Sequence, residues 1–475
     1  MKQFLLFILC VFCTLNISAQ NSLEVYPAPE GVEMKNDFTV KVRQPGGEWQ
    51  TLSTYMVKVD EVREAKHHVE KASLAYFDFA GEVEVSVTSN NGLIEQGRVR
   101  PLSYGIEPKI SGQTMTFSLN KPCNLSVEVN GDIFHNLHLF ANPLDENKPK
   151  KIKKQKDLIY FAPGVHRLPG DTLLIPSGKT VYVAGGARVY GRLLVKDAED
   201  VNIFGRGIVH PEGRGEGIYI MNSKRVKVDG IITTQCPTGG SDSVKITNVK
   251  VISSYGWGDG LNVFASNNVL FDGVFCRTSD DCTTVYATRK GFAGGCCNIT
   301  MQNAVLWADV AHPIMIGLHG DVEKNEVMEN LNYVNIDILD HKEKQVDYQG
   351  CFAINVGDNN LVRNVRFENI RIEDFRQGQL FNIRIFYNKK YCLAPGRGVE
   401  NILFKDVVYN GKNAELSIIA GYNEERKVKN IRFENLQING EVISDDMAGK
   451  PTWYKTGDMA RIFVGEHVED VTFVK

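Results

Sequence analysis

Beyond its first twenty residues, the sequence lacks a long apolar segment. No later stretch approaches the roughly eighteen consecutive apolar residues that a membrane-spanning helix needs. Neither sign of charge dominates, because 54 Lys and Arg residues are balanced by 57 Asp and Glu residues, for a formal net charge of −3. Since proteins that bind nucleic acids or membrane surfaces carry a basic excess, we expect no nucleic-acid partner and no membrane insertion.

Cysteine is sparse, and its spacing lacks the pattern of a metal site. The eight cysteines after residue 20 include no CxxC pair and no His/Cys cluster with zinc-ligand spacing. We therefore expect no metal and no cofactor. The sequence leaves open whether these cysteines are buried thiols or form a few disulfides. They are Cys123, Cys236, Cys276, Cys282, Cys296, Cys297, Cys351 and Cys392.

The first twenty residues, MKQFLLFILCVFCTLNISAQ, have the form of a signal peptide. Lys2 provides the positive start, FLLFILCVF the apolar run and ISAQ the small-residue cleavage region. A lipoprotein anchor through Cys10 or Cys13 is disfavoured, because the two cysteines lie within or at the edge of the apolar run and not in the ISAQ cleavage region. We expect an exported protein, either periplasmic or extracellular.

Two regions of the remaining chain differ in rhythm. Residues 21–146 alternate apolar and polar residues in short bursts such as EVEVSVTS and NLSVEV, separated by turn signals such as NNG. This pattern predicts an antiparallel β-sandwich. The lysine-rich segment 147–157 follows, and we interpret it as a solvated linker rather than an electrostatic docking patch.

Residues 158–475 are built from a repeat whose units start with asparagine and then alternate apolar with polar residues. Because the apolar spacing is two, and one unit cannot bury its apolar face alone, the units must be stacked strands. We predict a right-handed parallel β-helix in which the asparagines form a hydrogen-bonded ladder. The clearest units are NVLFDGVF (268–275), NITMQNAVL (298–306), NLNYVNIDI (330–338), NVRFENIRI (364–372), NILFKDVVY (401–409) and NIRFENLQI (430–438).

Three aspartates come together when these coils are stacked. Residues one coil apart lie one above the other at about 4.8 Å. Aligning GDGLNVFA (258–265) with DDCTTVYA (280–287) places Asp259 over Asp281, with Asp280 beside them. The next coil, AHPIMIGL, places His312 over Cys282, diagonal to the acids. Like charges this close raise at least one pKa, as a general acid requires.

A second copy of the tripeptide SDD, at 444–446, has no matching aspartate in the coil before it. We interpret it as a surface turn.

The acid-bearing blocks resemble those of the polygalacturonase-type glycoside hydrolases, which comprise family 28 and its clan relatives in family 49, the dextranases and isopullulanases. The resemblance rests on GDG at Asp259, DDC (280–282) and HPIMIG (312–317), and a β-sandwich before the β-helix is similar to the family 49 layout. It implies an O-glycoside hydrolase that inverts the anomeric centre. Asp280 would be the general acid, and Asp259 with Asp281 would hold and deprotonate the attacking water, about 6.5–9.5 Å from the acid.

The chain departs from the polygalacturonases at one place. Those enzymes carry an Arg-x-Lys pair about one coil after the histidine, where it grips the galacturonate carboxylate. The corresponding stretch here, 350–357, has no basic residue, and NIRI (382–385) has an arginine without a lysine. This favours a neutral polysaccharide or oligosaccharide, such as an α-glucan, over a uronic one, although Arg289 and Lys290 could partly compensate.

Alternatives to this hydrolase are a polygalacturonase-like pectin hydrolase, a polysaccharide lyase and a non-catalytic carbohydrate-binding β-helix.

Several other side chains near the acids are candidates for substrate binding. His312 would bind the sugar or tune a carboxyl pKa, unless it is a structural histidine, and His319 in GLHG is a second such residue. Trp257 and Trp307 flank the acids in sequence and would stack on sugar rings, with packing beneath a loop as the structural alternative.

Overall fold

A computed structural model describes residues 22–64, 66–150 and 156–475 of the protein. The predicted signal peptide and residues 151–155 of the lysine-rich segment lie outside these residues. Within the described residues, no helix is both long and apolar enough to cross a membrane.

The N-terminal region is a β-sandwich, as predicted, and its last strand ends at Asn142. Val85 and Val87 of one sheet face Phe77 and Leu139 of the other across the apolar core. All neighbouring strands run antiparallel except the pair β5–β11, which is parallel. One sheet contains β1 (Ser22–Val25), β4 (Tyr55–Arg63), β5 (Lys66–Ala80), β7 (Gly97–Arg100), β10 (Cys123–Val129) and β11 (Asp132–Asn142). The other contains β2 (Phe38–Arg43), β3 (Gln50–Thr51), β6 (Val83–Ser89), β8 (Lys109–Ser111) and β9 (Thr114–Leu119).

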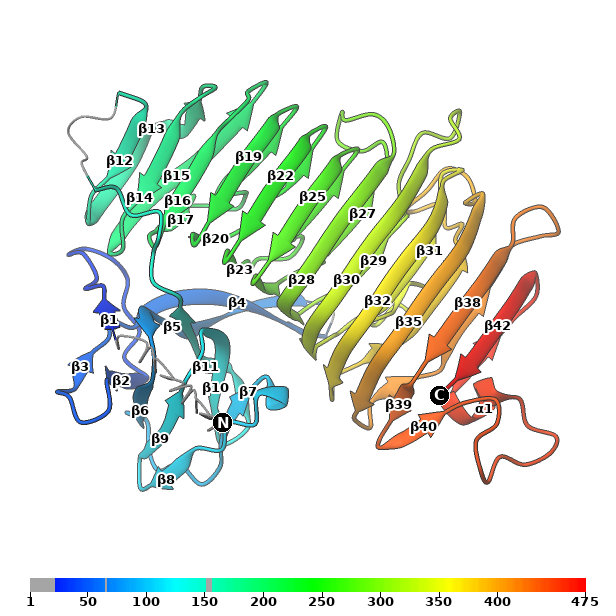
Figure 1. Cartoon of the computed structure of the whole chain (residues 1–475), viewed down its shortest axis with the longest axis horizontal. Helices are drawn as coiled ribbons and strands as arrows, with labels where there is room; N and C mark the ends of the chain where they lie inside the picture. Colours follow the sequence, from blue (N-terminus) through cyan, green and yellow to red (C-terminus); the bar gives the residue numbers. More distant parts are fainter. Residues whose placement is uncertain (1–21, 65, 151–155) are drawn as a thin grey trace, which may run out of the picture.

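From Leu158 to Val474 the chain forms the predicted β-helix, a continuous set of 29 strands whose coils stack in parallel. Figure 1 shows β19, β22, β25, β28, β30, β32, β35, β38 and β42 side by side along one face. That first column contains β12 (Leu158–Phe161), β14 (Thr180–Val183), β16 (Asn202–Gly205), β19 (Lys224–Asp229), β22 (Asp242–Thr247), β25 (Asn267–Asp272), β28 (Cys296–Ala308), β30 (Val327–Asp340), β32 (Leu361–Glu373), β35 (Gly398–Asn410), β38 (Val428–Glu434) and β42 (Val468–Val474).

Two more columns complete each coil. The second contains β13 (Gly164–Ile175), β15 (Ala187–Lys196), β17 (Ile208–His210), β20 (Ile232–Thr233), β23 (Lys250–Ile252) and β26 (Phe275–Thr278), continues in the later halves of β28, β30, β32 and β35, and ends at β39 (Leu436–Ile438). The third contains β18 (Ile218–Met221), β21 (Thr238–Gly239), β24 (Leu261–Phe264), β27 (Thr283–Tyr286), β29 (Ile314–Ile316), β31 (Phe352–Val356), β34 (Phe381–Ile385), β37 (Ser417–Ala420) and β41 (Ile462–Val464). Outside the columns lie β33 (Gly378–Gln379), β36 (Ala414–Glu415), β40 (Glu441–Ile443), α1 (Thr456–Ala460) and the short 3-10 turns Leu102–Tyr104 and Val346–Tyr348.

The predicted asparagine ladder is present at the turn within the first column. Each side-chain amide donates to the amide oxygen of the previous coil, at 2.9–3.4 Å, from Asn268 through Asn298, Asn330, Asn364 and Asn401 to Asn430. All six residues have φ between 53° and 58°. Asparagine tolerates this left-handed conformation better than other non-glycine residues do, so one residue type serves both the turn and the ladder.

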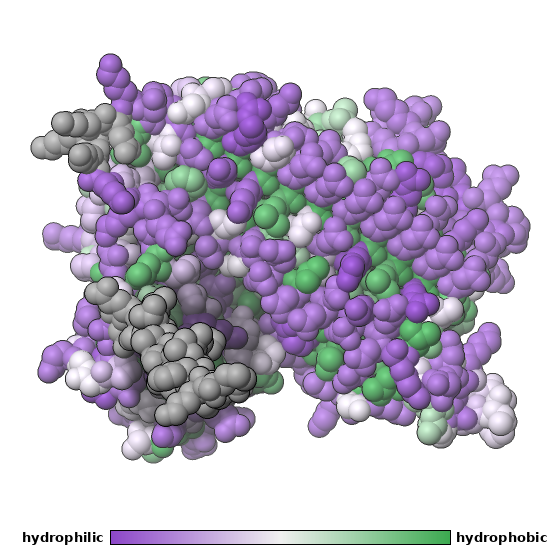
Figure 2. Space-filling view, viewed as in Figure 1, coloured by the Kyte–Doolittle hydropathy of each residue, from purple (hydrophilic) through white to green (hydrophobic). Residues whose placement is uncertain are grey.

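The interior of the helix is filled by stacked side chains. Tyr333, Phe367, Phe404, Phe433 and Phe473 form one aromatic column, with ring centroids 4.7–5.0 Å apart. The eight cysteines of the described residues are all free thiols, most of them buried, so no disulfide holds this part of the chain together. Figure 2 shows hydrophobic residues on this face only as scattered groups among hydrophilic ones.

The sandwich packs against the second column of the helix through the hairpin β4–β5 and strand β11. Figure 1 shows β4 running along the helix beneath β20, β23 and β28. Tyr55, Val59 and Phe140 of the sandwich share an apolar cluster with Ile232 and Phe275 of the helix. Buried arginines with carboxylate partners reinforce this interface, as where Arg206 donates to Asp78 at 2.8 Å. The two domains therefore form one packed unit.

Replacing ladder residue Asn330 should reveal the left-handed constraint. We expect Asn330→Gly to be more stable than Asn330→Ala by about 1 kcal/mol, because alanine resists the left-handed conformation whereas glycine adopts it freely. Asn332 in β30 provides the matched control, since its backbone is extended. There alanine should be the more stable replacement. Chemical denaturation of the four variants tests this, and the same ranking at both positions would refute it.

Candidate active site

The acid cluster lies where the loops of three successive coils enter the third column. Leu261 pairs with Thr283, Val263 with Val285 and Phe264 with Tyr286, so the predicted alignment of these two coils is confirmed. The amide of Gly260 donates to the carbonyl of Asp281 at 2.9 Å, which keeps the preceding loops in register. Asp259 is therefore level with Asp281, as the sequence predicted.

The predicted position of His312 was wrong by one residue. Thr284 pairs with Met315, which places His312 level with Asp281 rather than with Cys282. The reason is the pleat: this register turns Ile314 and Ile316 into the core and Met315 outward, and a one-residue slip would reverse them. The consequence is direct contact, because His312 Nδ1 lies 2.6 Å from Asp281 Oδ1 and its backbone amide donates to the same oxygen at 3.1 Å.

His312 is held as an imidazolium. Its Nδ1 faces the Asp281 carboxylate and its Nε2 contacts the carbonyl oxygen of Tyr348, so both ring nitrogens must donate. Burial opposes the charge, but the Asp281 carboxylate outweighs it, and the pKa of His312 is raised. Asp281 therefore has a buried cation as its partner, and Tyr286 also donates to it, at 3.3 Å.

The other two carboxyl groups lack such a partner. Burial, and then the charge of Asp281, raises the pKa of Asp259 to about 7, although Asn262 donates to it at 2.6 Å. Burial, and then the charges of Asp259 and Asp281, raises the pKa of Asp280 well above its usual range. Both keep part of their surface open to solvent. The cluster thus separates one carboxyl that holds its proton from one that can act as a base.

The loop that carries Asp259 is fixed by the sandwich. Tyr255, Gly256 and Trp257 have successive φ values of 73°, 69° and 48°, a left-handed run that needs support from outside the loop. Asp60 of β4 accepts the amide of Gly256 at 3.0 Å and the ring of His67 at 2.5 Å. The loop presents the Trp257 side chain, which is 75% exposed.

The remaining predicted residues divide into two groups. Trp257 and Lys290 line a cavity of about 210 Å³ that also includes Gly258, next to Asp259. His319 is nearly buried against Tyr286, with ring centroids 4.9 Å apart, and the Arg289 charge adds to burial in lowering the pKa of His319. Lys290 and Trp257 therefore border the acids, whereas His319 supports Tyr286 from behind.

The prediction that Trp307 stacks on a sugar ring was wrong. Trp307 is fully buried in the second column, beneath the sandwich, with the Arg277 guanidinium carbon 4.0 Å from its ring centroid. Its flanking position in the sequence was misleading, because β28 turns that part of the coil toward the other domain. Its neighbour Asp309 pairs with Arg277 in the same interface at 2.8 Å.

The second SDD copy lies away from the acids. Asp446 is exposed and pairs with Lys475, while Asp445 accepts the amide of Phe473 at 3.0 Å. These bonds fit the predicted surface turn. The described residues also include no group of three or more His, Cys, Asp or Glu side chains arranged to hold a metal ion.

Sequence reasoning missed Asn262, Tyr286 and Tyr348. Asn262 and Tyr286 were recoverable, because both alternate outward on strands that the acids precede. Tyr348 was not, since it lies in a loop without periodicity, where it packs edge-on against His312 at 4.6 Å and stacks on Tyr391 at 4.5 Å.

The fold places the protein among right-handed parallel β-helix proteins that carry an N-terminal β-sandwich. Among solved structures it is similar to Dex49A from Penicillium minioluteum, with a TM-score of 0.67 and 12% identity over 95% of this chain and 96% of that one. It is also similar to the family 28 exopolygalacturonase of Yersinia enterocolitica, with a TM-score of 0.51 and 12% identity over 82% and 96% of the two chains. No protein-family model and no curated protein sequence matches the chain.

We predict that His312 stays protonated at pH 7 while His319, whose pKa is lowered to about 3, is neutral. Nitrogen-15 NMR of the two imidazoles distinguishes these states, and a neutral His312 at pH 7 would contradict the assignment. Because the folded pKa of His312 is raised, its contribution to stability is complete below its unfolded pKa of about 6.5 and declines as pH rises through the folded pKa.

Proposed function

We propose that the protein is an exported glycoside hydrolase that cleaves a polysaccharide or oligosaccharide with inversion. The observation that carries the proposal is the division of one carboxyl cluster into a proton-holding Asp280, an Asp281 paired with His312 and an Asp259 poised near neutrality. Environments that drive the pKa values of neighbouring carboxyl groups apart are the requirement for paired acid and base catalysis.

In the proposed reaction Asp280 donates its proton to the glycosidic oxygen as the bond to the anomeric carbon breaks. A water held by Asp259 and Asp281 attacks the opposite face of the sugar and gives up a proton to Asp259. His312 takes no part in proton transfer. It pairs with Asp281, which orients the water and whose charge helps to keep the pKa of Asp280 high.

The surroundings of the acids support a neutral sugar at the point of cleavage. One coil after His312, strand β31, which pairs with β29, turns Ala353 and Asn355 outward where a uronic acid would need a cation. Arg384 on the next strand pairs with Asp347 at 2.9 Å. An α-glucan, as for dextranases and isopullulanases, is our first choice. A polygalacturonase-like action on pectin is the alternative that Lys290, beside Asp259, would favour.

Asp280→Asn should lower kcat by about 10²–10⁴-fold, because the general acid is lost while the fold is kept. The substrates to compare are dextran, pullulan and polygalacturonate, with reducing ends and absorbance at 235 nm as readouts. Asp446→Asn, in the second SDD copy, is the matched control and should leave kcat unchanged. Unsaturated products would instead identify a lyase, and binding without turnover in the wild type would identify a carbohydrate-binding protein.

Activity should depend on pH as a bell. It should rise through about pH 7, where Asp259 loses its proton and becomes the base, and fall where Asp280 loses its own. The measurement is kcat against pH, with NMR of the first-formed anomer to test inversion. A maximum near pH 4, or net retention of configuration, would refute the assigned roles.

A further inference from the structure

A second cavity, of about 450 Å³, lies between the sandwich hairpin and the early coils of the helix. Lys58, His210 and Glu212 line both this cavity and the smaller one beside Asp259, so the two form one groove. Arg188 lies on β15, and strand β23 precedes the loop that carries Asp259. Three successive pairings, β15–β17, β17–β20 and β20–β23, connect these two strands, so they are three coils apart. Coils repeat at about 4.8 Å, so Arg188 lies about 14 Å along the helix axis from the acids, a span of several sugar rings.

Arg188 is a cation without a counter-ion. Arg188 is partly buried, and the buried arginines Arg100, Arg206 and Arg277 and the partly buried Arg376 each pair with a carboxylate. Arg188 forms no ion pair within the described residues, and its buried Nε has no hydrogen-bond acceptor there. Burial lowers its pKa. Buried N–H groups nearly always have an acceptor, so a guanidinium that lacks one and lines a cavity indicates a ligand that supplies the partner.

A second buried polar atom points to the same cavity. The hydroxyl of Thr233 lines it and has no hydrogen-bond partner in the described residues. The Arg188 and Arg167 guanidinium carbons lie 5.0 Å and 4.4 Å from the ring centroid of Tyr190. The cavity therefore combines an aromatic ring with an unused hydroxyl and an unpaired guanidinium, a set that suits a sugar with an acidic substituent.

The charge of the side chains that line the whole groove also favours an anionic ligand. Within the described residues, Lys58, Arg188, Arg214 and Lys290 line it without any carboxylate partner. The acidic side chains Glu212 and Glu216 are neutralised, the first by Arg167 and the second by Arg192 at 2.7 Å. Among the described residues that line the groove, Glu33 is then the one acidic side chain without a basic partner. Burial lowers the pKa of His210 to about 4, so this histidine is neutral at pH 7.

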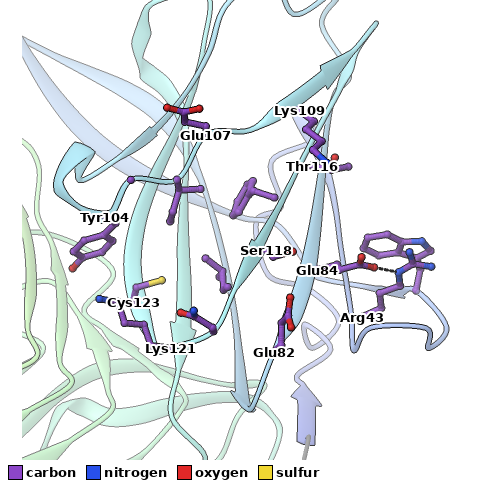
Figure 3. Close-up of a pocket in the computed structure, with 16 residues that line it drawn as sticks. Arg43, Glu82, Glu84, Tyr104, Glu107, Lys109, Thr116, Ser118, Lys121 and Cys123 are labelled. Atoms are coloured by element: carbon purple, nitrogen blue, oxygen red, sulfur yellow. Dashed lines mark hydrogen bonds and ion pairs between the residues drawn. The ribbon is translucent and has the colours of Figure 1, made fainter.

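The larger cavity of the sandwich, of about 560 Å³, shows the contrast. Figure 3 shows Arg43 pairing with Glu84 at one side of it and Tyr104 at the other. Its three basic residues are matched by three acidic ones, and none of its lining atoms combines burial with a missing partner. The lining of that cavity therefore gives no indication of a charged ligand.

We propose that the cavity at Arg188 is a subsite for a negatively charged group, a carboxylate or a sulfate ester, carried by the saccharide chain several rings from the bond that is cleaved. This rests on the proposed function for the identity of the ligand as a saccharide. The sugar at the cleavage point is still proposed to be neutral. The subsite adds to this an acidic substituent on a sugar several rings away. The substrate would then be a polysaccharide in which neutral and acidic residues occur together.

Calorimetric titration of the Asp280→Asn protein, which cannot consume its ligand, tests the subsite. Trigalacturonate supplies carboxylates, neocarratetraose disulfate supplies sulfate esters, and maltotriose is the neutral probe. Arg188→Gln, added to this background, should weaken binding of the acidic probe by about tenfold or more, the value of one charge-assisted hydrogen bond, and leave maltotriose unaffected. Affinity for the acidic probe should also fall as ionic strength rises.

Two further variants control this experiment. Lys58 lies on the sandwich hairpin, so Lys58→Gln tests the groove without disturbing a helix coil. This variant should also weaken binding of the acidic probe. Arg225→Gln removes an exposed arginine that pairs with Asp200 at 2.7 Å outside the groove, and it should change nothing. If neither acidic probe binds, or if Arg188→Gln and Lys58→Gln bind them as the parent does, the subsite is refuted even when a neutral polysaccharide is hydrolysed. If the acidic probe binds through Arg188 but no polysaccharide is cleaved, the subsite stands and the hydrolase proposal falls.

Discussion

The regular stacking of coils is the constraint on which the rest of this structure depends. A hydrogen-bonded repeat of about 4.8 Å turns a separation of twenty to forty residues in sequence into direct contact. The asparagine ladder, the aromatic column and the level pair Asp259 and Asp281 are consequences of the same register. A one-residue slip would reverse the inward and outward faces of every strand beyond it, so the apolar core also protects the alignment of the acids.

Within that frame, a single buried ion pair organises the chemistry. Three carboxyl groups in a desolvated cluster cannot all be charged, and of the three Asp281 has the buried cationic partner, His312. Burial, and then the charges of Asp259 and Asp281, raise the pKa of Asp280. His312 thus affects Asp280 through Asp281, without contacting Asp280 itself.

Much of the fold was predictable because it is periodic. The β-helix, the ladder and the Asp259–Asp281 pair all follow from the alternation within coils and the spacing between them. The misplacement of His312 and the burial of Trp307 have a different origin. The first depends on which residues of β29 face the core, and the second on contact with the sandwich. Contacts between the two domains leave no periodic trace, so Asp60 and Arg188 gave no signal in the sequence.

The hydrogen bond from the Gly256 amide to Asp60 makes the helix dependent on this particular sandwich domain. The loop before Asp259 receives its shape from a carboxylate some two hundred positions earlier, in a different fold. A foreign sandwich grafted onto the same helix would leave three left-handed residues without support beside Asp259. A transfer of the helix to another protein would therefore have to carry the sandwich with it.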